Sequence, residues 1–119
     1  MTKQTWTLTD VEQDIFVEHI SLSADHVPGR AAGYSVNKRT LRGGLREGVD
    51  VIEVNNGLFR FVVIPTRGMG LWRAGIGDLQ LGWKSPVKGP VHPSFVRLSE
   101  ANGLGWLGGF DELLCRCGL

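Results

Sequence analysis

The sequence Asn55-Asn56-Gly57 most constrains the fold of this chain, because it separates two runs rich in strand-forming residues. The first run covers residues 49–54 and the second covers residues 58–64. An Asn-Gly pair between two such runs is a strong signal for a β-hairpin with a type I′ turn, which needs positive φ at both central residues. The sequence therefore predicts a hairpin over residues 49–64.

Alternate residues of a strand share one face of the sheet. Both faces of the second predicted strand are largely apolar: Phe59, Phe61 and Val63 share one, and Leu58, Arg60, Val62 and Ile64 share the other. This pattern is typical of a strand that lies between two layers.

Further strands are predicted on both sides of this hairpin. Residues 69–74 and 79–83 flank a glycine-rich turn and predict a second hairpin, in which Leu79, Leu81 and Trp83 alternate with Gln80 and Gly82 as in a half-buried strand. Residues 34–42 and 113–119 read as additional strands, and residues 26–33 and 84–93 as loops. Thr9 and Glu12 have the spacing of a capping box, which predicts a short helix or a single turn near residues 10–14.

Composition limits the class of protein. The chain has 119 residues, enough for one small domain, and its formal net charge of +1 gives no reason to expect nucleic acid as a partner. No apolar run approaches the roughly 20 residues of a membrane span, and the N-terminus lacks the apolar core of a secretory signal, so the expected location is the cytoplasm. The 17 glycines predict many turns and little helix.

The C-terminal end suggests a larger protein. The chain stops on the apolar sequence Cys117-Gly118-Leu119, whereas domains seldom end on an apolar strand with no solvated residue beyond it. We therefore expect the front part of a longer sandwich, whose open sheet edge invites self-association. Cys115 and Cys117 are expected to be buried thiols, although a redox pair or half of a metal site is the alternative.

The segment IPTRGMGLW places Arg67 where an apolar strand ends. Its guanidinium can bridge neighbouring hydroxyls, so that beside aromatic residues it suits a neutral polyol ligand. The alternative is a salt bridge to Asp50, Glu53 or Asp111. Four tryptophans (Trp6, Trp72, Trp83 and Trp106) fill the core or, alternatively, offer faces on which a sugar ring stacks.

Other motifs exclude several chemistries. RGMGLWRAGIG is not followed by a helical period, so it is no dinucleotide fingerprint, and no P-loop, H-E-x-x-H or G-x-S-x-G sequence occurs. His19, His26 and His92 lack metal-ligand spacing, and we expect structural roles for them. Asp111 and Glu112 would face opposite ways on a strand, which disfavours a glycosidase carboxylate pair; either one could accept a hydrogen bond from a ligand hydroxyl, but a surface loop is the favoured interpretation.

Three segments resemble the aldose 1-epimerase (galactose mutarotase-like) superfamily, in particular an uncharacterised bacterial branch known as a domain of unknown function. They read VNNGLFRFVVIPTRGMGLWRA, LQLGWKSPV and GLGWLGGFDELLCRCGL, and span residues 54–119. The resemblance implies an all-β, antiparallel sandwich, incomplete over residues 1–119. Residues 1–48 would form a weakly assigned leader and first strands, and residues 49–119 the hairpins and the wall of a sugar cleft.

The resemblance also implies a function. Mutarotases interconvert the α and β anomers of a sugar with a glutamate base and a histidine acid, and in the family's order both would follow Leu119, so no catalytic residue is assigned. Arg67 matches the family's arginine-glycine position, and Arg67, Trp72, Trp106 and Asp111 are the predicted carbohydrate-binding residues. We expect a monosaccharide or related polyol as ligand, with no cofactor and no metal. A binding module without chemistry and a structural or interaction β-domain are the alternatives.

Overall fold

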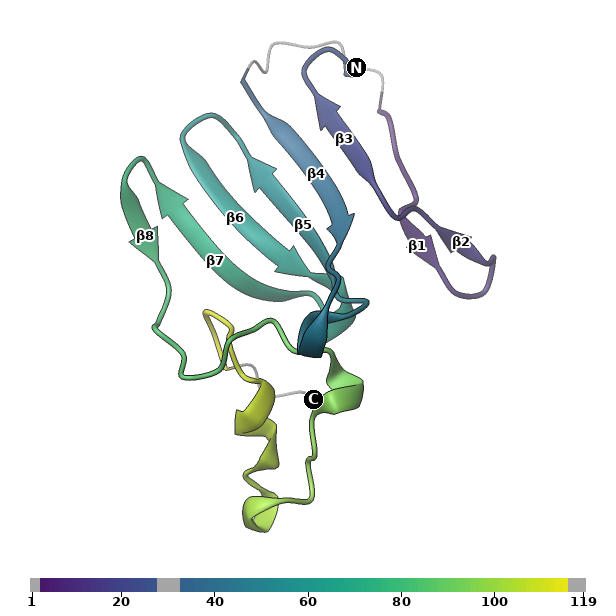
Figure 1. The fold of residues 1–119 in the computed structure, drawn as a ribbon. Coiled ribbons are helices and arrows are strands. Elements are labelled where there is room, and N and C mark those ends of the chain that lie inside the picture. The colour runs from purple at the N-terminus through teal and green to yellow at the C-terminus, as the bar shows by residue number, and fades with distance from the viewer. Residues whose placement is uncertain (1–2, 28–32, 116–119) are drawn as a thin grey trace.

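The computed structural model describes residues 3–27 and 33–115 (Figure 1). Its main feature is a six-stranded antiparallel sheet in which each strand pairs with the next one along the chain. The strands are β3 (Ile20–Ser23), β4 (Ser35–Thr40), β5 (Asp50–Asn55), β6 (Phe59–Ile64), β7 (Gly70–Ile76) and β8 (Leu79–Leu81). A separate two-stranded ribbon is formed by β1 (Thr9–Asp10) and β2 (Ile15–Phe16). The predicted all-β, antiparallel class is therefore confirmed.

Short 3₁₀ turns make up the helical content. They are η1 (Gly44–Arg46), η2 (Pro65–Arg67), η3 (Pro93–Phe95), η4 (Ala101–Gly103) and η5 (Gly105–Gly109). Figure 1 shows that the segment after β8, with η3 to η5, lies beyond one end of the sheet, beside η1. None of the helical turns in the described residues is long and apolar enough to cross a membrane.

The predicted hairpin over residues 49–64 is present as β5 and β6, but its turn is not type I′. Gly57 has φ 93°, whereas Asn56 is not among the described residues with positive φ. Instead, the Asn56 side-chain oxygen accepts hydrogen bonds from the backbone N–H groups of Leu58 and Phe59, at 3.0 and 2.7 Å. The asparagine side chain thus closes a longer loop, and only the glycine adopts the left-handed conformation.

The second hairpin is also confirmed, as β7 and β8. Its pairing with β6 contains a β-bulge: Val62 pairs with Arg73 and Val63 pairs with Leu71, so Trp72 is the extra residue. A bulge changes the direction of a side chain relative to the regular alternation of the strand. The sequence reasoning did not anticipate this bulge, which decides how Trp72 is placed.

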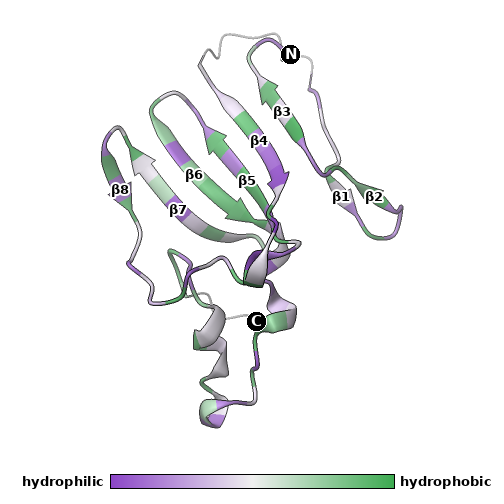
Figure 2. Ribbon diagram, viewed as in Figure 1, coloured by the Kyte–Doolittle hydropathy of each residue, from purple (hydrophilic) through white to green (hydrophobic). Residues whose placement is uncertain are grey.

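The apolar core is small. Val49, Val51 and Ile64 are buried together, and Leu41, Val62 and Trp72 pack against them. Figure 2 shows apolar residues distributed along the strands of the sheet. The β6 side chains other than Ile64 are only half-buried, and Leu79, Leu81 and Trp83 are exposed, contrary to the half-buried pattern predicted for them. For Leu79 and Leu81 one reason is that β8 is the edge strand of the sheet, with a neighbouring strand, β7, on one side only.

A buried ion pair lies beside this core. Lys38 on β4 has no exposed side-chain area, and its Nζ lies 3.3 Å from Asp50 Oδ1. The same ammonium donates to the Val17 carbonyl at 2.5 Å, and Thr40 Oγ1 donates to Asp50 Oδ1 at 2.6 Å. Neighbouring strands therefore share one polar network, in which the lysine also lies 4.4 Å from the Phe16 ring centroid.

The two ends of the chain agree only in part with the elements predicted for them. Residues 11–14 form a single turn between β1 and β2, in which Asp10 rather than Thr9 accepts a hydrogen bond, from the Gln13 N–H at 3.1 Å. Residues 113–115 are not a strand, although the Leu113 N–H donates to the Leu71 carbonyl at 2.7 Å. Cys115 is exposed, so its predicted burial is wrong, while residues 116–119, with Cys117, lie outside the described residues.

The loop around η1 contains a carboxylate, Glu47, whose contribution to stability depends on pH. The Gly43 N–H donates to Glu47 Oε2 at 2.6 Å, and Arg42 Nη1 lies 3.1 Å from Glu47 Oε1. The backbone hydrogen bond first, and Arg42 second, lower the pKa of Glu47 below its ordinary value. The stabilisation from this carboxylate is therefore present above its unfolded-state pKa and is lost as pH falls through the lower folded-state pKa.

Side-chain carbon chemical shifts followed through an acid titration would measure this. We expect Glu47 to titrate below an ordinary glutamate, and Arg42→Gln to raise its pKa only part of the way back, because the Gly43 hydrogen bond remains. An ordinary pKa for Glu47 in the unsubstituted protein would contradict the arrangement of the loop.

Candidate functional site

The candidate site lies at the end of the sheet where β6 ends and β7 begins. The segment after β8 packs there, and it brings Val91, Asp111 and Glu112 against residues of η2 and β7. Figure 1 shows this segment below the ends of the strands. Residues about 40 positions apart in the chain thus meet at one place.

Arg67 is held by an ion pair at this end of the sheet. Pro65 begins the 3₁₀ turn η2, and Gly68 ends it in the left-handed conformation, with φ 62°. Arg67 Nε lies 2.9 Å from Glu112 Oε1, and Nη1 donates to the Val91 carbonyl at 3.0 Å. Only 14% of the Arg67 side chain and 10% of the Glu112 side chain are exposed. The salt-bridge alternative therefore holds, but with Glu112 in place of Asp50, Glu53 or Asp111.

Gly70 makes room for this ion pair. A Cβ atom at position 70 would lie 2.7 Å from Glu112 Cδ, which is closer than real Cβ contacts allow. Since the carboxylate is held by Arg67, it could not move aside without weakening the pair. The glycine at the start of β7 is thus required by a close approach of the Glu112 side chain.

Trp72 and Asp111 form a second contact between β7 and the C-terminal segment. The indole Nε1 donates to Asp111 Oδ2 at 3.0 Å, and Asp111 is 8% exposed. Asp111 and Glu112 lie outside any strand and accept hydrogen bonds from different partners, which agrees with the expectation that they do not share a site. The interpretation of this pair as a surface loop is wrong, because both residues are buried.

The Trp72 ring is half-buried. It packs against the core cluster, and the Arg73 guanidinium carbon lies 4.4 Å from its ring centroid. Trp83, by contrast, is 46% exposed, with its ring 5.6 Å from that of Phe110. Trp106 is 38% exposed and contacts the same phenylalanine edge-on at 5.5 Å. Of these three tryptophans, Trp83 and Trp106 offer more ring surface to a ligand than Trp72.

The four predicted binding residues are divided between two depressions. Arg67 and Trp106 line a depression of about 340 Å³, together with Thr66, Gly68, Pro93, Val96 and Leu98. Trp72 and Asp111 line a larger one of about 690 Å³, which we call the β7–β8 cleft. Its other lining residues are Arg46, Arg73, Gln80, Leu81, Gly82, Trp83, Lys84, Ser85, Val87, Lys88 and Gly89. No described contact tests whether any of the four binds a sugar, so these assignments remain predictions.

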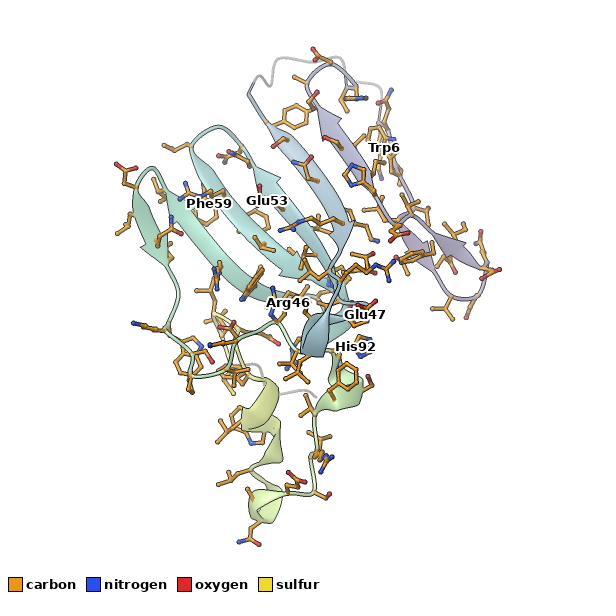
Figure 3. All side chains as sticks on the ribbon, viewed as in Figure 1. Trp6, Arg46, Glu47, Glu53, Phe59 and His92 are labelled. Atoms are coloured by element: carbon orange, nitrogen blue, oxygen red, sulfur yellow. The ribbon has the colours of Figure 1, made fainter. Side chains whose placement is uncertain are left out.

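Sequence reasoning missed most of the polar lining of the β7–β8 cleft. Lys84 and Ser85 belong to the segment LQLGWKSPV, which contributed only to the family resemblance. Arg46 and Lys88 carried no local signal, because their approach to β7 depends on how two separate loops pack. Figure 3 shows Arg46 at the end of the sheet, near the segment that follows β8.

Two of the histidines have structural contacts. His92 Nδ1 accepts a hydrogen bond from the Ser94 N–H at 3.1 Å at the start of η3, and His26 Nδ1 accepts one from the Ser23 N–H at 3.1 Å. Within residues 3–27 and 33–115, no group of three or more His, Cys, Asp or Glu side chains is placed to hold a metal ion.

Comparison with known proteins identifies the family. The family model described as "Domain of unknown function (DUF4432)" matches residues 46–119. A search of curated proteins found no match. The chain is similar to a crystal structure from Klebsiella pneumoniae subsp. pneumoniae MGH 78578, described as a "putative aldose 1-epimerase", with a TM-score of 0.85 and 35% sequence identity.

That match covers 92% of this chain and 29% of the Klebsiella protein, so the chain spans less than a third of the length of its relative. The mutarotase-like fold predicted from the sequence is thereby confirmed, and the described residues contribute a six-stranded sheet to it. Because the family model also covers more than half of the sequence, the chain belongs to the DUF4432 family of galactose mutarotase-like proteins.

Proposed function

We propose that this chain forms one wall of a monosaccharide-binding cleft, and that the longer protein of which it is part interconverts the α and β anomers of its sugar. The observation that carries the proposal is the β7–β8 cleft, which combines an exposed tryptophan face with hydrogen-bonding side chains. The similarity of the chain to the Klebsiella structure, described as a "putative aldose 1-epimerase", supports a sugar as the ligand.

The cleft has the size and chemistry that a monosaccharide needs. Its volume of about 690 Å³ lies within the range of small-molecule sites. The exposed Trp83 ring can pack on the C–H face of a sugar ring. Gln80 and Ser85 supply donors and acceptors for hydroxyls, and the Asp111 carboxylate has more acceptor capacity than one indole N–H uses.

Anomer interconversion needs more than binding. A base must remove the proton of the anomeric hydroxyl, and an acid must protonate the ring oxygen so that the ring opens and closes again. The buried carboxylates at this end of the sheet already accept hydrogen bonds, Asp111 from Trp72 and Glu112 from Arg67. We therefore assign binding to this chain, and proton transfer to residues that follow Leu119 in the longer protein.

Sugar binding can be tested by titrating the chain with D-galactose and D-glucose while following tryptophan fluorescence. We expect saturable quenching, and about a tenfold weaker Kd for Trp83→Ala, since the packing of a sugar C–H face on the indole is lost and a tenfold change in Kd corresponds to about 1.4 kcal/mol. Trp6→Phe, at an exposed tryptophan of the N-terminal segment that does not line the cleft, is the matched control. Absence of a response to either sugar would overturn the proposal.

Polarimetry separates the assignment of binding from that of chemistry. With a fresh α-anomer, the 119-residue chain should leave the spontaneous rate of mutarotation unchanged. A faster rate would show that the acid and base lie within it. A longer protein that binds sugar but leaves the rate unchanged would favour the binding module without chemistry.

Self-association is a second candidate function, favoured by the edge of the sheet. Leu79 and Leu81 on the edge strand β8 are 61% and 40% exposed. An exposed apolar edge strand pairs readily with another chain. Light scattering over a range of concentrations would reveal a dimer, and Leu79→Lys should abolish it; a monomer at all concentrations would exclude this candidate.

A further inference from the structure

We propose that the sugar bound in the β7–β8 cleft carries a phosphate group, and that a cluster of four cationic residues binds this group. The cluster consists of Arg46, Arg73, Lys84 and Lys88. The inference rests on the proposed function, because it names the class of sugar for the same cleft. It replaces the neutral polyol expected from the sequence with an anionic ligand.

The charge of the cleft carries this inference. Asp111 is the single acidic residue among its lining residues, so positive charges exceed negative ones by three. The whole chain has 13 basic and 12 acidic residues, for a net charge of +1. The positive charge in the cleft is therefore a local concentration and does not follow from composition. A phosphate carries close to two negative charges at neutral pH and would balance most of it.

None of the four cations is neutralised by a carboxylate in the part of the chain that the structure describes. The ion pairs there involve Lys38, Arg42, Arg67 and Arg97. Glu53 and Arg73 line one small hollow together, but their charged groups are not within ion-pair distance. Asp111, the acidic residue of the cleft, is engaged by the Trp72 N–H.

The four cations converge from three separate elements. Arg46 belongs to η1, Arg73 to β7, and Lys84 and Lys88 to the loop after β8. Trp72 holds the Arg73 guanidinium over its ring at 4.4 Å, and this contact limits the freedom of the long side chain. A guanidinium in a fixed orientation can give a phosphate two parallel hydrogen bonds, while the lysines act as point charges.

The arrangement also explains why Trp72 and Trp83 differ in exposure. The half-buried Trp72 orients Arg73 and binds Asp111, so its role is to position polar groups. The exposed Trp83 lies next to Lys84 in the chain and lines the same cleft. A sugar ring on Trp83 would thus lie close to the cationic cluster, with its neutral hydroxyls toward Gln80 and Ser85.

Calorimetric titration at constant ionic strength can test this with four probes: glucose, glucose 6-phosphate, glucuronate and inorganic phosphate. We expect glucose 6-phosphate to bind at least about tenfold more tightly than glucose, as one charge-assisted contact allows, and its affinity to fall as salt rises. Lys84→Gln combined with Lys88→Gln should remove this advantage and leave glucose binding unchanged. Arg39→Gln, an exposed cation on β4 outside the cleft, should have no effect.

The outcomes separate this inference from the proposed function. Equal affinity for glucose and glucose 6-phosphate would overturn the phosphate assignment and leave sugar binding intact. Glucuronate binding as tightly as glucose 6-phosphate would overturn the assignment of phosphate to the charged group. If glucose 6-phosphate bound no better than inorganic phosphate and glucose did not bind, both the inference and the proposed sugar site would be wrong.

Discussion

Replacing Asp50 with alanine is expected to lower the free energy of unfolding by about 3–5 kcal/mol, because it leaves the fully buried Lys38 ammonium without its counter-ion. The remaining Val17 carbonyl satisfies only one of its three donors. Thr40 would lose its acceptor at the same time. For a small domain this is a large part of the total free energy of unfolding. A variant that shows no cooperative unfolding transition at all would therefore agree with the same expectation.

Urea unfolding followed by circular dichroism would measure this effect. The double substitution Lys38→Met with Asp50→Leu removes both charges, and it should recover most of the lost stability. Glu100→Gln is the matched surface control, because the Arg97–Glu100 pair is 79% and 61% exposed and should contribute about 0–1 kcal/mol. An Asp50→Ala variant as stable as the unsubstituted chain would show that the pair is not buried.

Glu112→Ala should destabilise the chain by about 3 kcal/mol, because it removes the carboxylate that holds the nearly buried Arg67 guanidinium. The loss should be concentrated where the segment after β8 meets η2. We therefore expect amide hydrogens of residues 91–113 to exchange faster in this variant, while those of β4 and β5 keep their protection.

Alanine substitutions at two separate glycines, Gly70 and Gly108, test the packing of Glu112 against the start of β7. Gly70→Ala places a methyl group against the Glu112 carboxyl and should cost about 1–3 kcal/mol. Gly108→Ala is the matched control, since a Cβ there would meet nothing within 4 Å and the residue has no positive φ. Equal stability of the two variants would mean that Glu112 does not pack against Gly70.

Much of the sheet could be predicted because its signals are local. The Asn-Gly sequence at residues 56–57 and the alternation on each side of it identify β5 and β6, and glycines identify the turn before β8. The bulge at Trp72 could not be predicted, since a bulge exists only relative to the register of the partner strand. The exposure of Leu81 and Cys115 likewise depends on which other segments cover them.

The candidate site could be predicted from the sequence less completely than the sheet. Arg67 was selected as a hydroxyl-binding group because a charged residue ends an apolar strand there, and the alternative, a salt bridge, is what the structure shows. Its partner lies 45 positions later, and no local pattern could rank Glu112 above Asp111 or Asp50. The cationic residues of the cleft come from two loops and a strand, and their common location is a property of tertiary packing alone.

The order of strands in the sheet has a consequence for the way the chain acquires its structure. Because every strand from β3 to β8 pairs with its immediate neighbour in sequence, each addition closes only a short loop. The turn at Asn56 and Gly57 can nucleate the process, and strands can join on either side without waiting for distant parts of the polypeptide. The hydrogen bonds that Leu45, Arg67, Leu71 and Trp72 make with the segment after β8 close the longest loops among those described, so they should form last. During synthesis, the sheet would then be assembled before the segment after β8 completes the β7–β8 cleft.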